Sequence, residues 1–218
     1  MKNKQGGFTL VEIAIVLVII GLLMGGVLKG QELINSAKVK NLANDFRSMS
    51  SFVYAYQDRF RALPGDDANV ANHVAGGVAA TSPAGTLNNA RTSGNWNSTT
   101  QTDETYLFWQ HVRLAGLATG TPTIGAAEYI PRNAEGGAIG ITGDAILTAP
   151  TTPWPGNFYI CSTGIQGRFA RQLDTMMDDG NTQTGTIRVI ANGVATQADA
   201  TLLAPANDQT QYTVCSAF

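Results

Sequence analysis

The chain has 218 residues, which suits one domain with or without an appendage, and its formal charge of −2 excludes a generally basic protein that coats nucleic acid. Charged residues make up only 14% of the chain, against about 25% in an ordinary soluble domain. The charges are also segregated: all five lysines precede residue 41, and residues 41–218 carry nine arginines and 14 acids. A basic, apolar N-terminal segment therefore precedes an acidic, polar body.

Residues 8–28 form an apolar run, FTLVEIAIVLVIIGLLMGGVL, whose one charged residue is Glu12. As a helix rising about 1.5 Å per residue, this run would be roughly 31 Å long, which matches the hydrocarbon core of a bilayer. Lys2 and Lys4 precede it, so the positive-inside rule predicts a cytoplasmic N-terminus and a body on the far side of the membrane. The sequence thus predicts a membrane-crossing segment.

Three kinds of segment are candidates for this run: a cleaved secretory signal, a plain N-terminal anchor, and a segment in which Glu12 has a function. A cleaved secretory signal has a shorter apolar core and a small-residue cleavage site, and no convincing A-x-A follows here. A plain N-terminal anchor fits the length but does not account for Glu12. A carboxylate within an apolar span costs about 2.5–3.5 kcal/mol on insertion scales, so such a residue is functional by default and needs a partner.

The string Gly7-Phe8-Thr9-Leu10-Val11-Glu12, with lysines before it and an apolar helix after it, resembles the class III signal of type IV prepilins and type II secretion pseudopilins. The resemblance implies that a prepilin peptidase cuts after Gly7 and methylates the new N-terminus, Phe8. Residues 1–7 would be the leader. Glu12 would match the family's glutamate, the fifth residue of the mature chain.

Glu12 and the glycines of the span suggest how the mature chain assembles. Pairing Glu12 with the new α-amine of a neighbouring subunit would offset the cost of burying both charges and set the register between subunits. Pilin helices typically melt in filaments between a glycine and a proline, and Gly21 matches that glycine, but Lys29 stands at the proline position. Gly25 and Gly26 weaken the helix locally, while close packing of helices on small residues explains the glycines equally well.

Beyond residue 28 the pattern becomes amphipathic. Apolar side chains recur at spacings of four and three, which is typical of one buried stripe on a helix: Leu42, Phe46, Met49, Val53, Tyr56 and Phe60. We expect a single helix over residues 8–60, ending before Pro64-Gly65, in which residues 8–28 lie in the membrane or filament core and project from the body. Residues 29–60 then pack on a globular head, residues 61–218.

The head is predicted to be α+β. Residues 65–102 are rich in small and polar residues, so we expect a long surface connection. A short helix should follow Asp103-Glu104, and a second should cover residues 167–177. Strands are expected at residues 157–162, 184–191 and 211–216, with loop and short strands over residues 120–155. The long helix packed on this small antiparallel sheet makes a pilin-like fold.

Cys161 and Cys215 are the only cysteines, and both lie in predicted strands of the exported part. An oxidising exterior favours a disulfide between them, although two buried free thiols remain an alternative. Closing a loop of this size is worth about 4 kcal/mol in the chain-entropy model. A C-terminal disulfide loop also resembles pilins.

We find no pattern of an enzyme's active site: the sequence contains no G-x-S-x-G, Walker A, H-E-x-x-H or C-x-x-C motif. His73 and His111 are the two histidines, and the ordinary expectation for His111, next to Trp109 on its helix, is a packed or hydrogen-bonded imidazole. We expect no cofactor and no dedicated metal site. Asp178 and Asp179 could offer oxygen ligands to Ca²⁺, but a solvated turn accounts for them as well.

The resemblance implies a structural subunit, not an enzyme, that polymerises into a type IV pilus-like surface filament. Its partners would be further copies of itself, the prepilin peptidase and an inner-membrane assembly platform, with no dedicated nucleic-acid site. The precursor would cross the inner membrane once with its body in the periplasm. A type II secretion pseudopilin or minor pilin is the first alternative, and a membrane-anchored periplasmic enzyme or binding protein is the second. Adhesion, motility, DNA uptake and secretion all remain open as roles.

Overall fold

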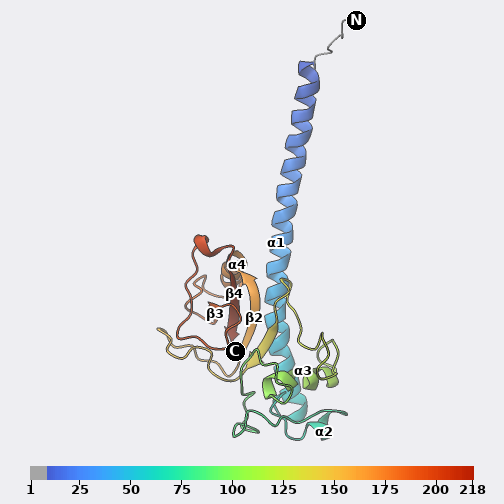
Figure 1. The fold of residues 1–218 in the computed structure, drawn as a ribbon, viewed down its shortest axis with the longest axis vertical. Helices are drawn as coiled ribbons and strands as arrows, with labels where there is room; N and C mark the ends of the chain where they lie inside the picture. The colour runs from blue at the N-terminus through green and yellow to red at the C-terminus, as the bar shows by residue number, and fades with distance from the viewer. Residues whose placement is uncertain (1–8) are drawn as a thin grey trace, which may run out of the picture. The chain divides into compact units, whose positions relative to one another are not determined.

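The structure is a computed structural model that describes residues 9–218 and divides into two units, one ending at Lys38 and one comprising Val39–Phe218 (Figure 1). Helix α1 runs through Leu10–Phe60 and contributes to both units. The other elements are α2 (Val70–His73), α3 (Glu104–Leu114), β1 (Ile139–Thr142), β2 (Tyr159–Gln166), α4 (Gly167–Met177), β3 (Ile187–Ala191), the 3₁₀ turn η1 (Pro205–Asn207) and β4 (Gln211–Ala217). This confirms the pilin-like α+β fold class.

Helix α1 ends at Phe60 as the sequence predicts and begins at Leu10; the predicted start, Phe8, lies outside the described residues. Its first part is rich in valine and isoleucine, which suit a strand in water; a helix is favoured in lipid because it satisfies every backbone group within one segment. At the other end, Arg61 adopts a left-handed φ of 55° and donates its N–H to the carbonyl of Gln57, 2.9 Å away. This conformation ends the helix three residues before Pro64.

Within the second unit, the predicted stripe of α1 is the largest contribution to the core. Five side chains of the stripe are each at most 2% exposed: Leu42, Phe46, Met49, Val53 and Tyr56. Phe60 is partly buried and packs on Tyr56. The same core takes in Ile160 of β2, Val189 of β3 and Val214 of β4. The amphipathic half of α1 therefore packs on the inner face of the sheet.

The four strands form one antiparallel sheet in the order β1-β2-β4-β3. Because side chains alternate along a strand, the inner face carries Ile160 whereas its neighbours Tyr159 and Cys161 point to the outer face. That outer face is covered by irregular segments, whose Trp96, Ile146, Leu147 and Trp154 form a second apolar cluster. Both faces of the sheet are therefore buried, although helices cover only one.

Both predicted head helices are present. Helix α4 has the bounds that the sequence predicts, and it buries Phe169, Ala170 and Leu173 against the sheet. Helix α3 starts at Glu104 and contributes Phe108 and Val112 to the same core. Strand β1 lies within the region where only loop and short strands were expected.

Residues 65–102 form the long, largely exposed connection that their composition predicts, interrupted by the short helix α2 and by a few buried residues. They include buried Val70 and Trp96, and the buried carboxylates of Asp66 and Asp67 organise the backbone around them. Asp66 accepts hydrogen bonds from the backbone N–H groups of Asn88, Asn89 and Arg91. These side-chain-to-backbone bonds satisfy the polar groups of the segment where it is buried, and composition did not predict them.

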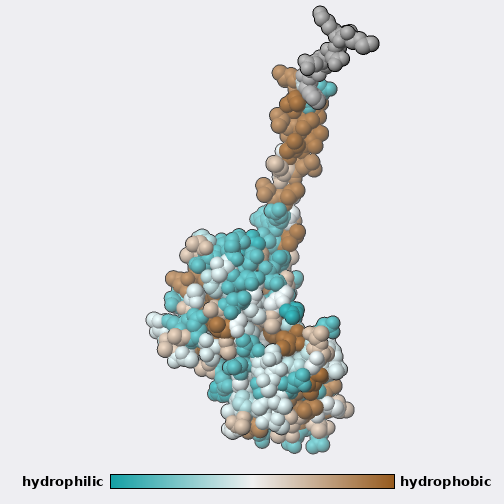
Figure 2. Space-filling model, in the orientation of Figure 1, coloured by the Kyte–Doolittle hydropathy of each residue, from teal (hydrophilic) through white to brown (hydrophobic). Residues whose placement is uncertain are grey.

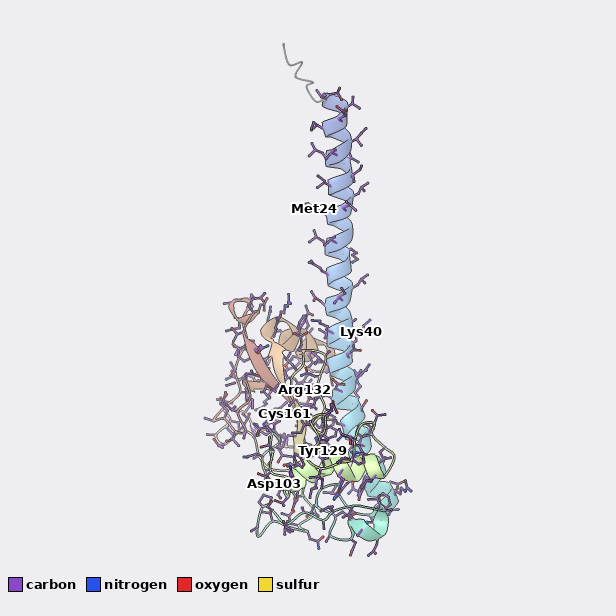
Figure 3. All side chains as sticks on the ribbon, turned by 45° about the vertical axis from the view of Figure 1, so that its right-hand side comes forward. Met24, Lys40, Asp103, Tyr129, Arg132 and Cys161 are labelled. Atoms are coloured by element: carbon purple, nitrogen blue, oxygen red, sulfur yellow. A yellow bond between two sulfur atoms is a disulfide. The ribbon has the colours of Figure 1, made fainter. Side chains whose placement is uncertain are left out.

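Cys161 and Cys215 form the disulfide that the sequence favoured, which excludes the alternative of two free thiols (Figure 3). The two residues lie directly opposite each other on β2 and β4, and neither is exposed to solvent. The bond therefore joins the two central strands within the outer apolar cluster.

Replacing both cysteines by alanine (Cys161→Ala with Cys215→Ala) should lower the free energy of unfolding by about 2–5 kcal/mol, because the bond closes a long loop in the unfolded chain. Urea unfolding of the purified full-length chain in detergent measures this change. Reducing the wild-type protein with dithiothreitol should reproduce it, since the described residues contain no free cysteine. Equal unfolding curves for the variant and the oxidised wild type would contradict the prediction.

Candidate functional site

The first candidate site is the apolar first part of α1. Every residue from Thr9 to Lys29 is exposed, including large side chains such as Leu10 at 86% and Met24 at 64% (Figure 3). Figure 2 shows apolar side chains covering the visible face of this part of the helix. By length and composition, α1 is the one helix in residues 9–218 that could cross a membrane. Such a surface needs cover from lipid or from other apolar helices.

Glu12 lies in the first turn of α1 and is bound to Thr9. Its Oε2 accepts hydrogen bonds from the backbone N–H of Thr9 at 2.8 Å and from the Thr9 hydroxyl at 2.7 Å, and the Thr9 Oγ1 lies 3.3 Å from the N–H of Glu12. This reciprocal arrangement is a capping box, in which two otherwise unpaired helix N–H groups are satisfied. Both donors to Glu12 are neutral, so its negative charge has no positive partner in these bonds.

Sequence reasoning missed this role of Thr9. The pattern Thr-x-x-Glu before an apolar run is itself the signature of a capping box, so the signal was present in the string that carries the resemblance. Cutting after Gly7 would leave the Phe8–Thr9 peptide intact, and with it the N–H of Thr9. The capping box is therefore compatible with the mature chain.

The sequence also assigned roles in processing and assembly to Gly7, Phe8 and three glycines of the span. Gly7 and Phe8 lie outside the described residues. Gly21, Gly25 and Gly26 all lie in continuous helix, and open space surrounds each of them. This space could admit another helix, and the same glycines could unwind in a filament.

Comparison with known proteins bears on this segment. Residues 2–28 match the model of the prokaryotic N-terminal methylation motif. The segment is a class III prepilin signal. No curated protein and no solved structure matches the chain. The match covers the signal and the apolar span that follows it. It does not extend to the head, so any function of the head must be argued from the residues of the head.

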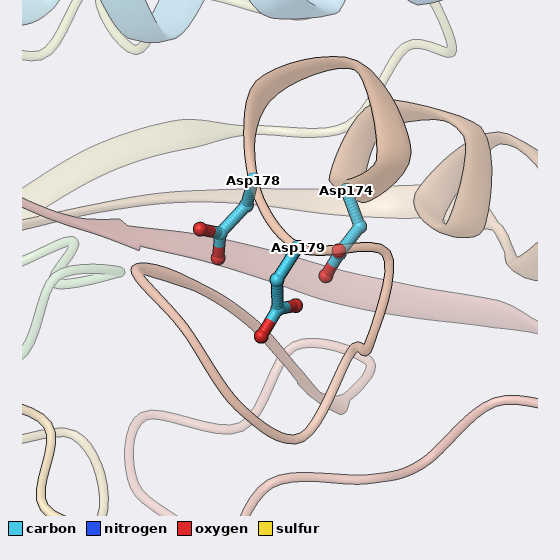
Figure 4. A group of neighbouring side chains, drawn as sticks. All are labelled: Asp174, Asp178 and Asp179. Atoms are coloured by element: carbon cyan, nitrogen blue, oxygen red, sulfur yellow. The ribbon is translucent and has the colours of Figure 1, made fainter.

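The second candidate site is an acidic cluster where α4 meets the loop to β3 (Figure 4). One carboxylate oxygen from each of Asp174, Asp178 and Asp179 lies within 4.8 Å of the others. Sequence analysis named Asp178 and Asp179 but did not include Asp174, which is fully buried in the last turn of α4. The spacing of four residues between Asp174 and Asp178 was a visible signal, because such residues share a helix face.

Asp174 is the unusual member of this cluster. Neither of its carboxylate oxygens has a hydrogen-bond partner of ordinary geometry. Burial raises the pKa of Asp174 to about 7, the N–H groups of Gly180 and Asn181 act to lower it, and the charges of Asp178 and Asp179 raise it further. The site therefore brings three acids together around one that the fold leaves uncompensated.

The two histidines have structural contacts. In His111, Nδ1 accepts the backbone N–H of Gly65 at 2.9 Å and Nε2 lies 2.8 Å from the carbonyl oxygen of Val78, an arrangement that places the proton on Nε2. Burial lowers the pKa of His111 and so favours this neutral form. His73 pairs through Nδ1 with Asp67, at 2.6 Å. The hydrogen-bonded imidazole expected for His111 is confirmed.

Glu104, at the start of α3, is a buried acid in which only one carboxylate oxygen has a hydrogen-bond partner. Its Oε2 accepts the N–H of Ser93 at 2.5 Å, whereas its Oε1 is buried without a partner. Burial raises the pKa of Glu104 from 4.5 to about 7; the Ser93 N–H opposes this shift, and the charges of Asp66 and Asp144 add to it. The folded chain therefore favours the protonated form of Glu104 in mildly acidic solution.

This raised pKa predicts a pH dependence of stability. Between pH 4.5 and about 7 the folded chain binds more protons at Glu104 than the unfolded chain does, so the free energy of unfolding should fall by up to about 1.4 kcal/mol for each pH unit as pH rises. Glu104→Gln removes this contribution. Urea unfolding across the window should show a shallower fall for the variant than for the wild type, and parallel curves would contradict the assignment.

Proposed function

We propose that this chain is a structural subunit that polymerises into a type IV pilus-like surface filament after cleavage between Gly7 and Phe8 and methylation of Phe8. The observation that carries the proposal is the prepilin signal at residues 2–28, which supports a type IV pilin or pseudopilin. The exposed apolar part of α1 agrees with it, because this surface needs lipid before assembly and neighbouring helices after it. Residues 39–218 form a compact unit that includes the second part of α1.

Glu12 supplies the physical reason for ordered assembly. An isolated carboxylate and an isolated amine are each unfavourable in lipid or in an apolar filament core, and pairing them offsets much of that cost. Glu12 has only neutral hydrogen-bond donors in the capping box. The α-amine created on Phe8 of an incoming subunit would supply the positive charge that is missing there. A buried pair of this kind selects one axial register, which is the best-attested use of buried charges.

The same features define the proposed location and partners. The lysines before the span favour a cytoplasmic N-terminus and a periplasmic head in the precursor, which the span anchors in the inner membrane. A prepilin peptidase would act at this stage, and an inner-membrane assembly platform would then extract the subunit into the filament. A head stabilised by a disulfide suits this exposure to an oxidising exterior.

A type II secretion pseudopilin or minor pilin is the second candidate within this class. The prepilin signal is common to both. Abundance distinguishes them, because a major pilin dominates a fraction of filaments sheared from the cell surface.

The first test is the mass of the native mature protein. Intact-mass spectrometry of the purified chain should show loss of residues 1–7 and addition of one methyl group, and N-terminal fragmentation should place that group on Phe8. Deleting the peptidase gene from the host should restore the full-length mass. A native protein that begins at Met1 would contradict the proposal, whatever the properties of the head.

The second test separates the charge of Glu12 from its capping role. Glu12→Val removes both, whereas Glu12→Gln keeps a side chain that can complete a capping box and removes the charge. Both variants should insert into the membrane normally and yield about tenfold fewer sheared filaments or less, since roughly 1.4 kcal/mol lost at a subunit contact changes association tenfold.

Glu32→Gln is the matched control, because Glu32 is an exposed acid of the same helix whose partner is Lys29, 2.6 Å away in its own chain. This variant should assemble at wild-type levels. If Glu12→Gln also assembles normally while Glu12→Val does not, the role of Glu12 is to cap its own helix, and the pairing between subunits is wrong.

A further inference from the structure

Asp45 is an acid of α1 whose charge is not compensated by its own chain. It belongs to the second unit, in the half of α1 that packs on the head, and its side chain is half-buried. Burial alone raises the pKa of Asp45 to about 6, so no positive charge or hydrogen-bond donor among residues 9–218 acts to lower it. A carboxylate that is partly removed from water in this way favours contact with a cation.

The carboxylate of Asp45 lies at a shallow hollow beside α1, with a volume of about 180 Å³. The walls of the hollow are mostly apolar and come from α1, α3 and the segment around the start of β1: Met49, Phe52, Trp109, Pro131 and Ile139. An apolar wall with one carboxylate suits a lysine, whose stem of four CH₂ groups packs on apolar surface while its ammonium group pairs with the acid.

The two arginines that line the same hollow have other partners. Arg113 donates hydrogen bonds to three backbone carbonyls within residues 119–129, at 3.1, 2.9 and 2.6 Å. Arg132 donates to the carbonyl of Gly136 at 2.8 Å. Neither guanidinium lowers the pKa of Asp45. The cation that Asp45 lacks must therefore come from outside this part of the chain.

Lys40 is the complementary group. It is exposed (Figure 3) and forms no hydrogen bond or ion pair with any of residues 9–218. Lys29, by contrast, pairs with Glu32 of its own chain at 2.6 Å. Lys40 and Asp45 are five residues apart on one helix, which separates them by about 140° around its axis. The two groups therefore point to different sides of α1 and do not pair within one chain.

The register proposed for the filament brings these two groups to nearly the same level. Pairing the amine of Phe8 in one copy with Glu12 of its neighbour displaces the two chains by four residues, about 6 Å of helix rise. Identical subunits keep one axial offset along their whole length. Where the α1 helices run parallel, Lys40 of the displaced copy lies level with the residue before Asp45, within about 1.5 Å of it, whereas Arg47 of that copy lies about 9 Å away.

We propose that Lys40 of one copy places its ammonium group against Asp45 of the next, so that the hollow beside α1 is a contact between sister chains. The lysine stem would cover Met49 and Phe52, and the ammonium group would supply the missing cation. Because the two halves of the contact lie on different sides of one helix, the contact is heterologous, and repeating it builds an open helical filament. The inference rests on the proposed polymerisation and adds a second fixed point, within residues 39–218, to the register set at Glu12.

The test is charge reversal in the full-length chain, expressed in its host. Lys40→Glu and Asp45→Lys should each lower the yield of sheared filaments about tenfold or more, because like charges then meet at the contact. Combining the two changes in one chain should restore most of the yield, since the pair forms again with its polarity reversed. Normal yields from both single variants, or no recovery in the double variant, would overturn the pairing.

The combination of Arg47→Glu with Asp45→Lys is the matched control. Arg47 is an exposed cation of the same helix, and a new acid at its position lies too far along the axis to reach Asp45 of the neighbour. This combination should not recover the yield. Equal recovery would show that only net charge matters, and the pairing would be wrong. Lys40→Glu changes an exposed residue and so spares the fold of the head.

Intact mass separates this inference from the function on which it rests. Every variant should still lose residues 1–7 and gain one methyl group, because processing takes place at the other end of α1. A wild-type chain that stays unprocessed or forms no filaments would contradict the proposed function and the contact together. Processed chains that assemble normally despite both charge reversals would overturn the contact alone.

Discussion

The rest of the structure depends on one constraint: the apolar side chains of α1 must be shielded from water. One continuous helical backbone carries an apolar surface on every side in its first unit and a single apolar stripe in its second. The stripe is covered by the chain itself, since Leu42, Phe46, Met49 and Val53 are buried among residues of the sheet and of α3 and α4. The first surface has no such cover in its own unit, so other molecules must supply it.

The head meets this constraint with a small sheet that is buried on both faces. Its inner face receives α1, while loops with large aromatic residues cover its outer face, where Cys161 and Cys215 join the central strands. Loops make a weaker cover than helices because their backbone groups need individual partners, which here are buried side chains such as Asp66 and backbone-to-backbone contacts. The disulfide stabilises the face that lacks helical support.

Local patterns predicted what local forces determine. The spacing of Leu42, Phe46 and Met49 reveals α1 because helix periodicity is a property of neighbouring residues, and the same holds for α4. The sequence did not predict the bounds of strand β1. The strand Ile139–Thr142 is short, contains glycine and is buried on both faces, so its side chains do not alternate between polar and apolar. The burial of Val70, Trp96 and Asp174 depends on contacts between distant segments, and composition does not encode these contacts. The prepilin signal was readable because it acts as a linear string.

Two acids of this chain share one physical problem, although they lie in different units. Glu12 is satisfied as a hydrogen-bond acceptor by Thr9, yet its charge would enter an apolar environment uncompensated. Neither oxygen of Asp174 has a hydrogen-bond partner of ordinary geometry, and the charges of Asp178 and Asp179 surround it. A proton could neutralise either group, but a neutral carboxyl gives neither register to an assembly nor order to a loop. A cation paired with Glu12 would set a register, because the pair forms only when the two groups meet. In the proposed filament, the amine of a sister chain would be that cation at Glu12, whereas a proton on Asp174 is favoured by burial, which raises its pKa to about 7.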